Sequence, residues 1–121
     1  MSARVQIVPG QQVLVTANSA AAPQIVYDWT AFGQSYARLL FSVIFTTADG
    51  NLILETSEAL LDDGTFADED IVSTEVCHPG KQKSVDVTDL FRLYWRLSLW
   101  SAAAAAQAPR TAYFTISGMT P

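Results

Sequence analysis

The amino-acid sequence predicts an all-β protein, an antiparallel β-sandwich of jelly-roll-like type with about eight strands. Apolar and polar residues alternate with a period of two along most of the chain. Turn signals such as Pro9-Gly10 and Asp49-Gly50 separate these stretches at short intervals. A length of 121 residues suits a single domain, so residues 1–121 are expected to form one sandwich. A closed β-barrel is the alternative architecture.

The first part of the chain predicts two short strands that could form an N-terminal arm. Val5 and Ile7, and then Val13 and Val15, alternate with polar residues on either side of Pro9-Gly10. The small-residue segment 18–23 separates this pair from the rest, which makes residues 1–16 a candidate N-terminal arm. Residues 24–29 are expected to form a third strand.

Residues 36–47 give the strongest strand pattern in the chain. One face of this strand is wholly apolar and is expected to lie in the core: Ala37, Leu39, Phe41, Val43 and Phe45. Asp49-Gly50 is predicted to supply the two positive-φ positions of a tight hairpin turn. Residues 51–57 would then return antiparallel to this strand.

The second half contains four more stretches with strand alternation: residues 71–77, 82–87, 90–100 and 111–117. Residues 60–70 are predicted to form a turn followed by a polar stretch. The alanine-rich segment 101–109 has high helix propensity but is too short for a stable helix. It is predicted to be a loop with one helical turn.

Composition excludes several classes of function. There are 7 basic and 12 acidic residues, and a net charge of −5 does not suit binding to nucleic acid or to an anionic membrane. No stretch approaches the roughly 18 apolar residues that a membrane span requires, and the first residues do not resemble a secretory signal. Cys77 is the sole cysteine, so an internal disulfide is excluded and a reducing cytoplasm is expected.

Metal and catalytic sites are not predicted. Five acidic residues lie within a short stretch: Asp62, Asp63, Asp68, Glu69 and Asp70. Calcium takes such oxygen ligands, but the spacing is not that of an EF-hand, and a solvated loop is the favoured interpretation. Cys77-His78 offers too few ligands for zinc, so a buried cysteine beside a loop histidine is expected. With one histidine and no nucleophile motif, the chain is predicted not to be an enzyme and to need no cofactor.

The strand at 90–100 carries the candidate interface. Its odd positions are apolar and are expected to be core residues: Phe91, Leu93, Trp95, Leu97 and Leu99. Its even positions include Arg92, Tyr94, Arg96 and Trp100, the residue types enriched at protein interfaces. Two alternatives stay open. The face could be a sugar platform, or an ordinary outer face whose arginines pair with carboxylates and whose aromatic rings cover a loop.

A second group of aromatic residues lies near a turn: Tyr27, Trp29, Phe32 and Tyr36. We expect these rings to pack together at a corner of the sheet.

The order of motifs from Glu55 onward resembles a known group of proteins. Glu55-Thr56-Ser57 and the turn Asp62-Asp63-Gly64-Thr65-Phe66 precede the strand at 90–97, and residues 112–118 follow. This order is similar to that of small tailed-bacteriophage virion proteins of β-sandwich type, in which an acidic turn, an arginine-bearing strand and a final Phe-Thr-x-Ser-Gly strand recur.

The resemblance implies a structural role. It implies a decoration, or cement, protein that binds the phage head lattice and stabilises it. The implied partners are the major capsid protein and sister subunits in a homotrimer, and the implied location is the phage head surface after synthesis in the host cytoplasm. The alternatives are a tail or connector component and a carbohydrate-binding module used in host adsorption.

Overall fold

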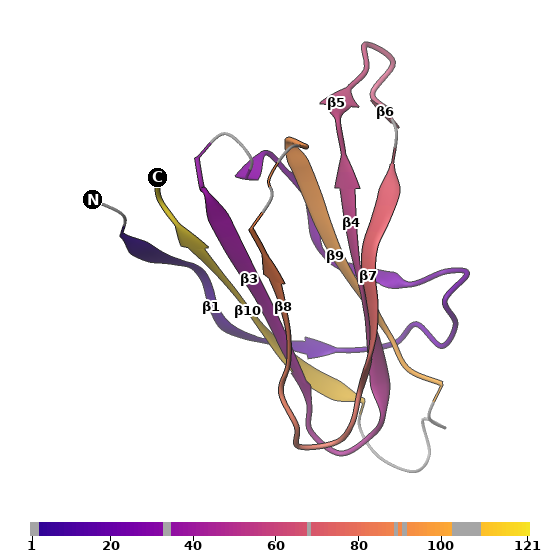
Figure 1. Ribbon diagram of the computed structural model, residues 1–121. Coiled ribbons are helices and arrows are strands. Elements are labelled where there is room, and N and C mark those ends of the chain that lie inside the picture. The colour runs from indigo at the N-terminus through magenta and orange to yellow at the C-terminus, as the bar shows by residue number, and fades with distance from the viewer. Residues whose placement is uncertain (1–2, 33–34, 68, 89, 91, 103–109) are drawn as a thin grey trace.

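The chain is an all-β sandwich, as the sequence predicted. The computed structural model describes residues 3–32, 35–67, 69–88, 90, 92–102 and 110–121. Within these residues, ten strands form two four-stranded antiparallel sheets and a two-stranded ribbon (Figure 1). None of the described residues form a helix long and apolar enough to cross a membrane.

The strand order identifies the architecture. The first sheet contains, from edge to edge, β1 (Arg4–Leu14), β10 (Thr111–Met119), β3 (Arg38–Phe45) and β8 (Lys83–Val87). The second contains β2 (Gln24–Thr30), β9 (Tyr94–Trp100), β4 (Gly50–Ser57) and β7 (Asp70–Cys77). The ribbon consists of β5 (Ala59–Leu60) and β6 (Phe66–Ala67) and projects beyond both sheets (Figure 1). Eight strands in this interleaved order make a jelly roll.

The core lies between the two sheets and follows the predicted alternation except at Ala37, which precedes β3 and is exposed. On β3, the side chains of Leu39, Phe41, Val43 and Phe45 are at most 1% exposed. On β10, Ala112, Phe114 and Ile116 face the same interior. The second sheet contributes Leu52, Leu54, Trp95, Leu97 and Leu99. Alternate residues on both sheets therefore point inward, as sandwich packing requires.

The predicted hairpin between residues 36–47 and 51–57 is wrong. β3 pairs with β10 and β8, whereas β4 pairs with β7 and β9, so the turn carries the chain from one sheet to the other. Both strands have an apolar face, and packing in facing sheets buries both faces at once. Gly50 does not have a positive φ; the described glycines that do are Gly64 and Gly80.

The two short strands predicted near the N-terminus are one strand. β1 pairs with β10 from Arg4↔Met119 to Leu14↔Thr111. Pro9-Gly10 lies at a register irregularity between Val8↔Ile116 and Gln11↔Phe114 rather than at a chain reversal. Proline lacks an N–H and is tolerated at such bulges on an edge strand. An arm that reached another molecule would have to release this pairing.

The last predicted strand pair also differs at its bounds. β9 begins at Tyr94, whereas the alternation predicted a start at residue 90. Leu93 is partly buried and Phe91 lies outside the described residues. The helical turn predicted within residues 101–109 falls mainly on residues 103–109, which also lie outside the described part of the chain. β10 runs two residues beyond the predicted end at Ser117.

Candidate functional surface

The outer face of the β2–β9–β4–β7 sheet carries the candidate interface. Because Trp95, Leu97 and Leu99 point into the core, the intervening residues of β9 point outward. The register places Arg96 opposite Glu55, and Trp100 opposite Asn51, on β4. The outward residues of these two central strands therefore form the middle of this face.

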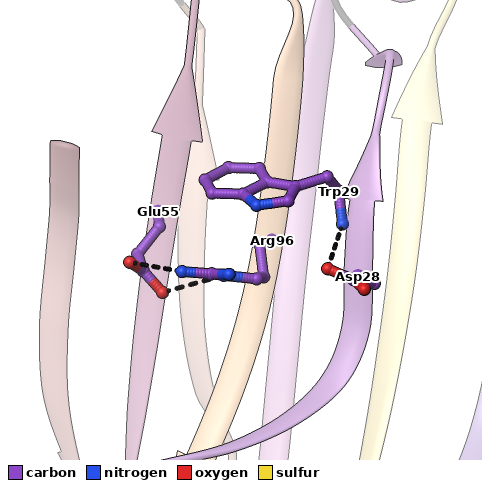
Figure 2. A network of polar contacts seen from close by, with 4 residues as sticks. All are labelled: Asp28, Trp29, Glu55 and Arg96. Carbon is purple, nitrogen blue, oxygen red and sulfur yellow. Dashed lines mark hydrogen bonds and ion pairs between the residues drawn. The ribbon is translucent and has the colours of Figure 1, made fainter. Parts of the chain in front are cut away.

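Arg96 is held by two partners on neighbouring strands. Its Nε and Nη2 donate to the Oε1 and Oε2 of Glu55 at 3.2 and 3.0 Å, and its Cζ lies 4.4 Å from the centroid of the Trp29 ring. Figure 2 shows the guanidinium lying against the face of the indole ring, with one edge directed at the carboxylate. The side chains of Arg96 and Glu55 are only 18% and 15% exposed, so the bidentate pair is shielded from solvent.

A row of aromatic rings continues from Trp29. Phe66 of the β5–β6 ribbon lies 5.0 Å from Trp29 and 5.2 Å from Tyr94, measured between ring centroids. These offset and edge-to-face contacts fasten the ribbon to the outer face. Asp28 Oδ1 accepts a hydrogen bond from the backbone N–H of Trp29 at 2.8 Å, at the end of this row (Figure 2).

The structure brings only part of the predicted interface together. Tyr94 and Arg96 share one cluster with Trp29 and Phe66. Arg92 precedes β9 and lines a groove between the sheets, where its carbonyl oxygen accepts a hydrogen bond from Trp95 Nε1 at 3.1 Å. Trp100 lies at the far end of β9. Tyr94, Arg96 and Trp100 therefore follow one strand from end to end, and Arg92 lies before it.

The predicted aromatic packing at a sheet corner is confirmed for three of its four residues. Phe32 lies 5.6 Å from Tyr27, 6.2 Å from Tyr36 and 6.4 Å from Phe41 between ring centroids. Trp29 instead stacks on Arg96 and Phe66 on the outer face.

Exposed apolar side chains add to this surface, and the sequence analysis missed them. Ile25 is 46% exposed, Ile71 is 57% exposed and Val76 is 56% exposed. Their cross-strand partners are Ser98, Glu55 and Asn51, all on the outer face. The sequence did contain a signal for this exposure: residues 71–77 have apolar residues at both odd and even positions. A strand with one solvated face has apolar residues at alternate positions only.

Exposed apolar side chains lie on both sheets and on the ribbon. Nine large apolar side chains of the described residues are substantially exposed. Ile25, Ile71 and Val76 lie on the outer face of this sheet, Leu60 and Leu61 on the ribbon and its turn, and Val72 lines the groove between the sheets. We call the outer surface formed by Ile25, Ile71, Val76, Arg96 and Trp100 the docking face. Exposed apolar residues beside an arginine and aromatic rings are the residue types enriched where proteins meet.

The acidic loop is organised as a turn. Asp63 Oδ1 accepts hydrogen bonds from the backbone N–H and the hydroxyl of Thr65 at 3.0 and 2.6 Å, which lowers the pKa of this carboxyl group. Asp68 lies outside the described residues. Among the residues that are described, no three His, Cys, Asp or Glu side chains gather closely enough to hold a metal ion.

Comparison with known proteins gives the fold but no family. The sequence matches no protein-family model and no curated protein. Among solved structures, one similar chain comes from Bacillus endospore appendages, which form a family of disulfide-linked pili. The two share 17% identity and a TM-score of 0.57, over 99% of this chain and 89% of the other.

Viral particle proteins share the same architecture. In the VP2 subviral particle of infectious bursal disease virus, the likeness has a TM-score of 0.55 at 9% identity. A second structure, of the Gx strain of that virus, gives 0.51 at 12%. The likeness covers 98% of this chain in both, but this chain spans only 31% of each viral chain. The chain thus has a sandwich fold that is also found in pili and virus particles.

Cys77 differs from a cysteine that could link subunits. As predicted, it is buried at the end of β7 beside an exposed loop histidine, with 1% of its surface accessible. Burial raises the pKa of this thiol to about 11. Only the thiolate attacks a disulfide, so the folded chain keeps its cysteine unreactive.

Cys77 should therefore react with an aromatic disulfide reagent at pH 8 much more slowly in the folded protein than in urea. A Gln12→Cys variant, with a thiol on the exposed part of β1, provides the fast-reacting reference. Stability should also fall as pH rises from about 9 to about 11, since the unfolded thiol ionises first. Equal rates for the two thiols in the folded state would contradict this assignment.

Proposed function

We propose that the protein is a structural component of a virus particle, and specifically a decoration protein that binds the head lattice of a phage. The observation that carries this proposal is the docking face, an apolar surface with a preorganised arginine–aromatic cluster on a jelly roll. The fold it shares with viral particle proteins and the order of motifs from Glu55 onward support the same role.

The partners in this proposal are the major capsid protein and sister subunits. Tyr94, Arg96 and Trp100 lie on the outward side of β9, so a partner that follows this strand would contact them together, whereas Arg92 lines the groove between the sheets. The Arg96–Glu55 pair is already formed, which reduces the side-chain ordering that binding requires. Many copies on a lattice add their affinities, so each contact need not be tight.

The test is rebinding to particles that lack the protein. Recombinant chain should bind such particles from its source and raise the temperature at which they release DNA. Val76→Asp places a charge on the docking face and should reduce binding at least tenfold without unfolding the chain, because Val76 is 56% exposed. Leu14→Asp is the matched control, since Leu14 is 61% exposed on the opposite sheet.

Failure of the wild-type chain to bind, or equal binding by the Val76→Asp variant, would overturn this use of the docking face. The copy number in purified particles, measured by quantitative mass spectrometry, gives a second check. A number on the scale of the capsid lattice supports head decoration. A few copies would assign the protein to the tail or connector, and its absence would remove the virion role.

A further inference from the structure

A small hollow lies on the outer face of the first sheet, near the end where the two chain termini lie side by side (Figure 1). It measures about 190 Å³, and all four strands of this sheet contribute residues to it. Pockets for drug-sized ligands begin at roughly 300 Å³, so this hollow suits a smaller group. Its lining includes three charged and three uncharged side chains: Arg4, Arg38, Asp86, Leu40, Ser117 and Met119.

The strand register explains why the surface is hollowed at this point. Ile116 of β10 points into the core, so Ser117 points outward. The cross-strand neighbours of Ser117 are Gln6 on β1 and Leu40 on β3, and both have longer side chains. The short serine therefore leaves a depression in the middle of this row. The next outward row closes one side of the depression: Arg4, Met119 and Arg38.

The charged residues give the hollow a net positive charge. Asp86 forms a bidentate pair with Arg38, which lowers the pKa of this carboxyl group and keeps it ionised at neutral pH. Arg4 forms no ion pair with any residue that the structure describes. Two guanidinium groups and one carboxylate leave the hollow with a formal charge of +1, on a chain whose net charge is −5.

The two arginines lie on either side of a single strand. Met119 is the cross-strand neighbour of both Arg4 and Arg38, so their Cα atoms are separated by two strand spacings, or roughly 10 Å. Both side chains line the hollow. A guanidinium group donates two parallel hydrogen bonds to a carboxylate, which makes arginine well suited to this anion.

The rest of the lining selects the kind of anion. Leu40 and Met119 give the hollow an apolar surface, so its ligand needs an apolar part as well as a charge. A formal charge of +1 matches a monoanion. A phosphate dianion would carry more charge than the hollow neutralises and would be repelled by Asp86.

We propose that this hollow binds a carboxylate carried on a short apolar chain. The carboxylate would accept hydrogen bonds from Arg4, and the apolar chain would lie over Ser117 against Leu40 and Met119. A small organic acid and the C-terminus of a peptide both present this chemistry. The hollow and the docking face lie on different sheets, so this proposal and the virion role can each fail without the other.

Titration of the full chain with pentanoate, followed by ¹⁵N NMR, tests the site. We expect saturable shifts of the amide signals of Leu40, Ser117 and Met119, with a Kd in the millimolar range. Pentanamide has the same chain without the charge and should bind severalfold more weakly. The absence of saturable shifts at these residues would overturn the proposal. Equal binding of pentanamide, or tighter binding of inorganic phosphate, would also overturn it.

Variants separate binding in the hollow from general attraction of anions. Arg4→Gln should weaken pentanoate binding severalfold. Lys81→Gln is the matched control, because it removes one positive charge from an exposed loop outside the hollow and should leave the Kd unchanged. Ser117→Leu should fill the hollow and abolish the shifts. Equal weakening by Arg4→Gln and Lys81→Gln would overturn the proposal, even if Ser117→Leu proves unstable.

A second pair of probes distinguishes the two sources of the carboxylate. N-acetylleucine represents a peptide C-terminus, and N-acetylleucine amide is its neutral counterpart. Tighter binding of N-acetylleucine than of pentanoate would support a peptide C-terminus as the ligand, and the reverse order would support a small organic acid. Equal binding of N-acetylleucine and its amide would contradict the role of the carboxylate and overturn the proposal.

Discussion

Replacing Gly50 with alanine should destabilise the fold by about 3 kcal/mol, a large effect for the addition of one methyl group. A Cβ atom at this position would lie 2.1 to 2.3 Å from the ring carbons of Phe45. Phe45 is fully buried, so its ring has no free space into which it can move. The expected result in thermal unfolding is a fall in Tm of about 10 °C.

Gly10→Ala is the control for Gly50→Ala. Its added Cβ would meet only Thr115 Cγ2 at 3.9 Å, an ordinary van der Waals contact, so the stability should barely change. Shortening the ring in Phe45→Leu/Gly50→Ala should cost less than the sum of the two single changes. If Gly50→Ala unfolds at the wild-type temperature, Phe45 does not fill this space as described.

Removing the guanidinium of Arg96 should cause the second-largest loss in the free energy of unfolding. In Arg96→Met, the carboxylate of Glu55 stays largely buried but loses its bidentate partner, and Trp29 loses its cation. We expect a loss of about 2 to 3 kcal/mol in the free energy of unfolding, measured with urea. The cost comes from an uncompensated buried charge more than from the contact itself.

A second change should reverse most of that loss. Glu55→Met/Arg96→Met removes both charges and should recover stability, because well-packed apolar residues can replace a buried ion pair. Arg38→Met breaks the pair with Asp86, in which the two side chains are 51% and 40% exposed, and should shift the urea midpoint much less. Equal losses for Arg96→Met and Arg38→Met would show that shielding of the Arg96 pair is unimportant.

The sequence predicted the strands better than it predicted their partners. Alternation identified the inward faces of β3 and β10, because the face to which a side chain points is set by its position along the strand. It could not show that β3 and β4 belong to different sheets, since a turn between two apolar strands suits either arrangement. Asp49-Gly50 looked like a hairpin signal for the same reason. Glycine is needed at position 50 because the Phe45 ring packs where a Cβ atom would lie. This contact depends on the tertiary structure and not on the turn.

The candidate surface was predicted in composition but not in geometry. Arg96 was recognised as an outward residue, and the open alternative that its charge pairs with a carboxylate is realised by Glu55. Trp29 and Phe66 are far from residue 96 in sequence, so no local pattern places them on one face. The arginine–aromatic cluster of the docking face is already formed in the isolated chain. The exposed apolar residues of this face belong to β7 and β2.

The position of the last strand has a consequence for synthesis. β10 lies between β1 and β3 and is the one neighbour of β1 among the described strands, so β1 pairs with a segment that is synthesised long after it. While the ribosome is still adding residues 111–119, β1 has no partner and one edge of β3 is open. Long-range pairing of this kind is slow and leaves edges that other chains can join. Closure of this sheet therefore waits for residues 111–119, and aggregation competes most strongly in the interval before β10 joins β1 and β3.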